Sequence, residues 1–165
     1  MHRFILAVAV LIGLGGSTAL GAGATPVKAI SPQEFKTLLE AERGNIVVVN
    51  LWATWCAPCL VEIPDLIKVE SELADLKVKL IGVAIDDAGP ATKQIDALKQ
   101  RYFPTFRTYA RDTTEVDYLV SIIDPAWNEV VPTTYVLDRT GKVKTRIQGK
   151  KSAAAFKAEI EAAAK

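Results

Sequence analysis

A run of apolar residues from Ile46 to Trp52, broken only by Asn50, leads into the two cysteines of the chain. Such a run is typical of a strand buried on both faces, as in parallel sheets that helices cover on both sides. Cys56 and Cys59 then stand three positions apart, where a helical pattern begins. A buried strand that ends at a Cys-x-x-Cys pair before a helix constrains both the fold and the chemistry of the site.

The residues around this strand predict an α/β fold. Ser31 and Glu34 form the capping box of a helix that precedes the strand. Apolar residues recur at helical spacing from the cysteines to about residue 75, and Pro64 is expected to kink this helix. A second buried strand is expected over residues 78–85. Strand, helix and strand in this order form a βαβ unit, whose two strands run parallel.

The second half of the chain predicts a helical insertion and then an antiparallel strand pair. We expect helices near residues 91–100, near 115–122 and after Ser152, and strands near residues 106–109, 133–138 and 142–148. A tight turn over residues 138–141 joins the last two strands. Residues 24–30 are expected to be only a short lead-in. The whole order predicts a central mixed β-sheet flanked by helices on both faces.

The first two dozen residues predict a secretory signal peptide. A short positive start precedes an almost wholly apolar stretch over residues 4–14, and Ala22-Gly23-Ala24 gives the small-x-small pattern of a cleavage site. The apolar stretch is short for a membrane span. We therefore expect residues 1–24 to be a signal peptide and residues 25–165 to be one exported, periplasmic domain. The alternative is an uncleaved signal that tethers the protein to the membrane.

Export and composition together narrow the chemistry of the cysteine pair. Disulfides persist outside the cytoplasm, but a bridge across two intervening residues closes almost no loop, so a structural staple is disfavoured. The single histidine, His2, would leave with the signal, which removes imidazole catalysis and most transition-metal sites. A net charge of +1 without a basic stripe argues against nucleic acid as a partner. The acidic residues Asp86, Asp87, Glu115 and Asp117 show no metal-binding spacing and are expected to be solvated.

The position of Cys56 between a strand and a helix favours a reactive thiolate. The thiolate is the attacking species in disulfide exchange, and free backbone N–H groups and the positive end of the helix dipole stabilise it. Cys59 lies one turn further along on the same side and should be less exposed. We therefore expect Cys56 to attack a partner's disulfide and Cys59 to resolve the mixed disulfide. Pro58 stands in the first turn, where its missing N–H costs little.

These residues resemble the thioredoxin superfamily and, more narrowly, its exported TlpA-like thiol–disulfide oxidoreductases. The resemblance is carried by residues 50–59, by Pro64 and by Val131-Pro132-Thr133-Thr134. It covers roughly residues 30–165, and residues 102–128 depart from the pattern. It implies a thioredoxin-like fold with a helical insertion after the βαβ unit. It also implies a monomeric protein-disulfide reductase without a cofactor, which acts on cysteine-containing proteins and needs an electron donor that the sequence does not identify.

The resemblance also implies how a substrate is held. Pro132 would follow a cis peptide bond and lie beside the cysteines, and the backbone of Val131 would pair with an extended substrate segment. A trans proline that merely opens a strand is the alternative. Trp55 is expected at the exposed rim of the site and Trp52 in the core. Trp127 is expected to pack internally, with the same substrate groove as its alternative.

The proton acceptor for the resolving thiol is missing from the expected positions. Asn50 stands where thioredoxins have a buried aspartate that assists proton transfer, and asparagine does not titrate. Ala57 stands between the cysteines, where some TlpA-like proteins have a glutamate. Glu62 is close in sequence but is expected to be a solvated helix residue. No carboxylate is thus evident to deprotonate Cys59.

Other functions stay open at this point. The protein could act as an oxidant instead of a reductant, because both share this fold and differ in thiolate stability. It could also be a non-enzymatic binding module in which the cysteines form an inert bridge. A copper chaperone is disfavoured because such proteins usually add a histidine and space their cysteines more widely. A peroxidase is disfavoured because the threonine–cysteine and arginine arrangement that activates peroxide is not recognisable around Cys56.

Overall fold

The computed structural model describes residues 26–87, 89, 91–114 and 116–165. The predicted signal peptide, residues 1–24, lies outside the described residues. In the part of the chain that the structure describes, no helix is both long enough and apolar enough to cross a membrane.

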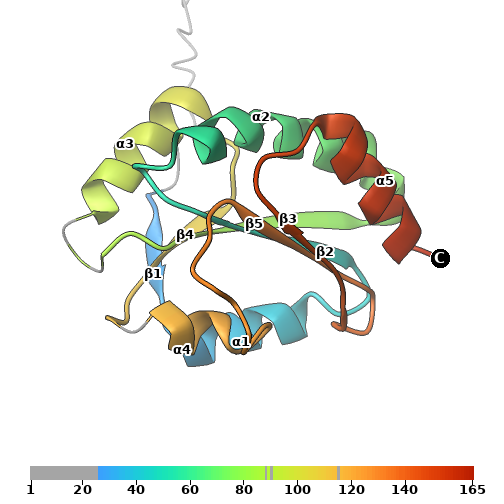
Figure 1. Cartoon of the computed structure of the whole chain (residues 1–165), viewed down its shortest axis with the longest axis horizontal. Coiled ribbons are helices and arrows are strands. Elements are labelled where there is room, and N and C mark those ends of the chain that lie inside the picture. The colour runs from blue at the N-terminus through green and yellow to red at the C-terminus, as the bar shows by residue number, and fades with distance from the viewer. Residues whose placement is uncertain (1–25, 88, 90, 115) are drawn as a thin grey trace, which may run out of the picture.

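One mixed six-stranded sheet, in the order β1-β4-β3-β2-β5-β6, organises the described residues (Figure 1). The strands are β1 (Lys28–Ile30), β2 (Ile46–Trp52), β3 (Val78–Ala84), β4 (Thr108–Arg111), β5 (Thr133–Leu137) and β6 (Val143–Gln148). The helices are α1 (Pro32–Ala41), α2 (Ala57–Glu72), α3 (Thr92–Tyr102), α4 (Val116–Val120) and α5 (Ala153–Ala163). A short 3-10 helix, Ala74–Leu76, follows α2.

Helices cover both faces of this sheet, as predicted. Figure 1 shows α2, α3 and α5 on one face and α1 and α4 on the other. The strands β1, β4, β3 and β2 run parallel, whereas β5 is antiparallel to both of its neighbours. The predicted βαβ unit is β2, α2 and β3, and α3, β4 and α4 form the insertion that separates it from the β5–β6 pair.

The central strand β2 is buried along its whole length. Because successive side chains of a strand point to opposite faces, its residues divide between two hydrophobic clusters. Val48 and Trp52 join the cluster that contains the cysteines, and Val49 and Leu51 join the cluster on the opposite face. Asn50 has the same parity as Val48 and Trp52, so its amide points toward the layer of α2.

Two local predictions are confirmed and one is wrong. Ser31 and Glu34 form the predicted capping box of α1, and Ser152 caps α5 by accepting the N–H of Ala155. Residues 24–30, however, are more than a lead-in, because Lys28–Ile30 forms β1 and pairs in parallel with β4. A three-residue strand has no readable alternation, and its pairing depends on a strand some eighty positions later in the chain.

A glycine on β3 makes room for the aromatic cluster under α3. Trp52 packs edge-on against Phe103, with ring centroids 5.6 Å apart, and its Nε1 donates to Thr108 Oγ1 at 2.9 Å. A Cβ atom added to Gly82 would overlap the ring of Phe106 and come within 2.7 Å of Thr108 Oγ1. The absence of a side chain at this position is therefore a packing requirement.

Gly82→Ala is accordingly expected to lower the free energy of unfolding by about 1–3 kcal/mol, the usual range for overpacking a core. The ring of Phe106 or the hydrogen bond between Trp52 and Thr108 must move to accept the methyl group. Urea denaturation followed by tryptophan fluorescence measures the change. An unchanged midpoint would show that this layer is looser than the structure indicates.

Candidate active site

The two cysteines lie shortly after the end of the central strand β2, at the start of α2. Cys56 is the N-cap residue of α2, and its Sγ accepts the backbone N–H of Cys59 at 3.3 Å. The two residues form a disulfide with their Cα atoms 5.3 Å apart. Cys56 is 4% exposed and Cys59 is fully buried at 0%, so the first cysteine is the one nearer to solvent. A thiolate at Cys56 would face the same backbone N–H and the positive end of the α2 dipole.

The residues between and after the cysteines form the first turns of α2. Ala57 and Pro58 occupy its first two positions and are exposed. The helix continues through Pro64, which is also exposed, to Glu72. The helix therefore offers an apolar, solvent-facing rim beside Cys56, while Cys59 faces the interior.

A buried aspartate fixes the loop that precedes Cys56. Asp86 follows β3 and is 6% exposed; its carboxylate accepts the backbone N–H of Thr54 at 3.0 Å and also the Thr54 hydroxyl. The prediction that Asp86 is solvated is therefore wrong. Because β2 and β3 run parallel, their carboxyl ends meet at one edge of the sheet, and this pairing could have suggested the contact.

The prediction of solvated acidic residues also covers Asp87, Glu115 and Asp117. Asp87 and Asp117 are exposed, as predicted, and Glu115 lies outside the described residues. Within the described part of the chain, no group of three or more His, Cys, Asp or Glu side chains is placed to hold a metal ion.

The proline that the sequence singles out lies at the same end of the sheet as the cysteines. Thr133 pairs with Leu51 across the β2–β5 ladder, so Pro132 and Val131 come next to the end of β2 and the loop that leads to Cys56. The Val131–Pro132 peptide bond is cis. The carbonyl of Val130 accepts the Thr133 hydroxyl at 2.6 Å and Trp127 Nε1 at 3.3 Å, so side chains on both sides anchor this turn.

The three tryptophans have different environments. Trp52 is fully buried, which confirms its predicted place in the core. Trp55 is 68% exposed directly before Cys56. Trp127 is buried, as predicted, yet it also lines a groove that Trp55 borders. Of the two tryptophans that shortly precede Cys56, Trp52 is thus a core residue and Trp55 a surface residue.

Glu62 is buried, although the sequence predicts a solvated residue at this position. It is fully buried at 0% exposure, and its Oε1 accepts Asn50 Nδ2 at 3.0 Å while its Oε2 accepts the backbone N–H of Lys151 at 3.3 Å. Asn50 Nδ2 also donates to Thr134 Oγ1 at 3.0 Å. The prediction of a solvated Glu62 is therefore wrong, and a buried carboxyl group lies on the same helix as the resolving cysteine, three residues after it.

Burial raises the pKa of Glu62 from its ordinary value to about 7, because desolvation penalises the charged carboxylate. The hydrogen bonds from Lys151 and Asn50 act in the opposite direction but are weaker. Glu62 lies three residues after Cys59 on the buried face of α2, and side chains at this spacing are neighbours. The site therefore combines a buried thiol with a carboxyl group that titrates near neutral pH.

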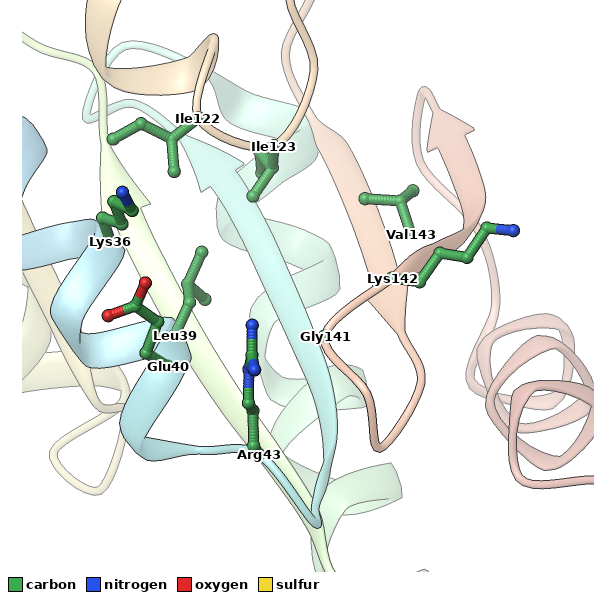
Figure 2. A pocket seen from close by; sticks show the side chains of 9 residues that line it. All are labelled: Lys36, Leu39, Glu40, Arg43, Ile122, Ile123, Gly141, Lys142 and Val143. Carbon is green, nitrogen blue, oxygen red and sulfur yellow. The ribbon is translucent and has the colours of Figure 1, made fainter.

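A second pocket, of about 590 Å³, lies apart from the cysteines (Figure 2). Figure 2 shows it between α1, the segment after α4 and the turn that joins β5 to β6. Leu39 and Glu40 of α1 line it, together with Arg43 from the segment that follows α1. Because α1 covers the face of the sheet opposite α2, this pocket is not part of the disulfide site (Figure 1).

Comparisons with known proteins agree with this arrangement. The signature of the AhpC/TSA family matches residues 25–146 of the chain. The thioredoxin-like protein YneN of Bacillus subtilis is 34% identical over 110 residues, which make up 66% of this chain and 59% of YneN. The thiol-disulfide oxidoreductase ResA of Oceanobacillus iheyensis is 29% identical over 106 residues, which make up 64% of this chain and 50% of ResA. The chain therefore matches only half to three fifths of the length of these curated relatives.

One solved structure shows the fold directly. The thiol:disulfide interchange protein, a thioredoxin family protein from Chlorobium tepidum, superimposes with a TM-score of 0.64 at 22% identity, covering 87% of this chain and all of that one. This likeness confirms the predicted thioredoxin-like fold.

Proposed function

The chain belongs to the AhpC/TSA family, and from that membership we propose that it is an extracytoplasmic thiol–disulfide oxidoreductase that reduces disulfides in partner proteins. The observation that carries the proposal is the Cys56–Cys59 disulfide at the N-terminus of α2, with the buried carboxyl of Glu62 one turn further along. The ResA relative is a thiol-disulfide oxidoreductase, which supports the same chemistry for this chain. Export rests on the signal-like residues 1–24.

The first step uses the reduced form of the protein. The Cys56 thiolate attacks one sulfur of the partner's disulfide, a new sulfur–sulfur bond forms, and the partner's bond breaks. The partner's second cysteine leaves as a thiolate and takes a proton from water. The partner is then held through a mixed disulfide at Cys56.

The second step releases the partner. The Cys59 thiol gives its proton to the Glu62 carboxylate, and the resulting thiolate attacks the Sγ of Cys56. The mixed disulfide breaks, the partner leaves with both cysteines reduced, and the protein keeps the Cys56–Cys59 disulfide. Two electrons have passed to the partner, and an external dithiol donor must return them for another cycle.

Asn50 supports both protonation states of Glu62 in this proposal. Its Nδ2 donates to the carboxylate, and its Oδ1 is buried without a hydrogen-bond donor in the described part of the chain. A protonated Glu62 could give its O–H to that oxygen after a small rotation. An asparagine at this position is therefore suited to a proton acceptor that is charged in one state and neutral in the other.

Substrate binding is assigned to the surface around the exposed sulfur. The backbone of Val131 would pair with an extended segment of the partner, and Pro132 would keep this edge free of a competing strand hydrogen bond. Trp55, Ala57 and Pro58 would supply apolar contact on the other side of Cys56. Val130, directly before Val131, is 41% exposed and would add an apolar side chain on the Val131 side.

The proposal is tested by reduction of insulin with dithiothreitol as the donor. We expect the protein to accelerate insulin precipitation, and we expect a reduction potential near that of thioredoxin, about −270 mV, for the cysteine couple. A potential near about −120 mV would reverse the physiological direction and make the protein an oxidant. No acceleration at all would favour a binding module with an inert bridge.

A further inference from the structure

A groove of about 650 Å³ borders the disulfide site. Trp55, which directly precedes Cys56, forms one wall, and Glu129, two residues before Val131, forms another. Trp127 also lines it, and the loop after β3 adds Asp86 and Asp87. Its lining thus includes the residue next to Cys56 and a residue two positions from Val131, whose backbone is proposed to hold the substrate. We call it the Trp55 groove.

Acidic side chains outnumber basic side chains in the lining of the Trp55 groove. The charged side chains that line it are three carboxylates, those of Asp86, Asp87 and Glu129, and one guanidinium, that of Arg111. The Asp86 carboxylate is buried and accepts the backbone N–H and the hydroxyl of Thr54, which are neutral groups. Glu129 is exposed, and its carboxylate has no ionic or hydrogen-bonding partner among the residues that the structure describes. The groove thus presents a net negative charge.

Arg111 does not cancel this charge for an incoming ligand. Its side chain is 7% exposed, and its guanidinium already donates to the carbonyl oxygens of Ile85, Asp86, Thr113 and Thr114. It also bonds Asp87 Oδ1 at 2.8 Å. Asp87 itself is 97% exposed, so its second oxygen stays open to solvent. Arg111 is thus already engaged, and a ligand in the groove would meet the exposed carboxylates of Glu129 and Asp87 beside the exposed side chain of Trp55.

We propose that the Trp55 groove binds a lysine or arginine that lies a few residues from the reactive cysteine of the partner protein. The inference rests on the proposed function and names the class of substrate that the site prefers. A cation over the exposed indole of Trp55 and beside the exposed carboxylates of Glu129 and Asp87 is favourable, and its aliphatic stem would pack on Trp127. Two to three residues of an extended segment span roughly 7–10 Å, which suits a groove that begins at the residue before Cys56.

Two peptides test this preference. They share one sequence with an internal disulfide and differ only in a lysine or a glutamate placed two residues from the attacked cysteine. The second-order rate constant for their reduction by the reduced protein is expected to be about tenfold higher for the lysine peptide. The ratio is normalised to the ratio measured with dithiothreitol alone, because a nearby lysine also makes the cysteine a better leaving group. The preference should shrink in 0.5 M NaCl, where the screening length is only about 4 Å.

Two charge-reversal variants test whether the preference for the lysine peptide arises in the Trp55 groove. Glu129→Lys should abolish or invert the preference, whereas Glu40→Lys should preserve it. Glu40 lies on α1 in the pocket of Figure 2, which shares no lining residue with the Trp55 groove, and its replacement changes the net charge by the same amount. Equal normalised rates for the two peptides, or an equal effect of both variants, would overturn the groove proposal alone. Failure to reduce either peptide would instead overturn the proposed function, and the groove proposal with it.

Discussion

Cys56→Ser is expected to abolish disulfide exchange, and Cys59→Ser is expected to trap the partner in a stable mixed disulfide. Cys56 is the more exposed sulfur, at the N-terminus of α2, so it is the one that a partner's disulfide can reach. Cys59 is fully buried, so it acts only on the bond that Cys56 has already formed. Stability should change little, because the bridge closes a loop of only two intervening residues.

The measurement is a gel without reductant after the reduced variants meet a disulfide-bonded protein such as insulin. Cys59→Ser should give a new band of higher mass that dithiothreitol removes, and mass spectrometry should place the bond at Cys56. The double variant Cys56→Ser/Cys59→Ser is the control and should give no such band. Full activity in Cys56→Ser, or a trap that forms through Cys59, would contradict the assigned roles.

The elements with strong local signals were predictable from the sequence. The continuous apolar run of β2 and the capping box of Ser31 and Glu34 each depend on residues within a few positions of one another. The turn over residues 138–141 likewise contains Gly141, which has a φ of +84°. Such signals act through backbone preference and periodicity, so they survive without knowledge of the tertiary structure.

The misplaced residues are those whose environment depends on distant partners. β1 exists because β4 lies beside it, and Asp86 is buried because the end of β3 meets the loop after β2. Glu62 is buried because Asn50, across the interface between α2 and the sheet, offers it an amide. One signal was available for Glu62, since it follows Cys59 by three positions and therefore shares the buried face of α2.

Glu62 is expected to make the protein less stable as the pH rises from about 4.5 to about 7. Its carboxyl has a pKa of about 7 when folded, against an ordinary value of 4.5. In that interval the folded protein binds more protons than the unfolded chain, so the free energy of unfolding falls with rising pH. The stability that the protein owes to the neutral Glu62 carboxyl is fully present below pH 4.5 and is lost above pH 7. This stability amounts to about 3–4 kcal/mol, at about 1.4 kcal/mol for each unit of pKa.

Glu62→Gln should remove this slope, because the amide does not titrate. The quantity to measure is the difference in unfolding free energy between the wild type and the variant, by urea denaturation of the oxidised proteins from pH 4 to pH 8. A constant offset from the altered hydrogen bond to Lys151 does not affect the slope. Glu40→Gln, an exposed carboxylate on α1, should leave the wild-type slope intact. A wild type whose slope matches that of Glu62→Gln would mean that the Glu62 carboxyl titrates at its ordinary pKa.

The same variant separates a proton acceptor from a merely structural group. Without the carboxylate, water must take the proton of the buried Cys59 thiol, so release of the mixed disulfide should slow by about a hundredfold, as for loss of other general bases. Attack by Cys56 should keep its rate, because the Cys56 thiolate needs no proton acceptor in the first step and Glu62 is fully buried. Stopped-flow measurement of the two phases would therefore show a selective loss in the second phase. An equal loss in both phases would instead mark a general distortion of α2.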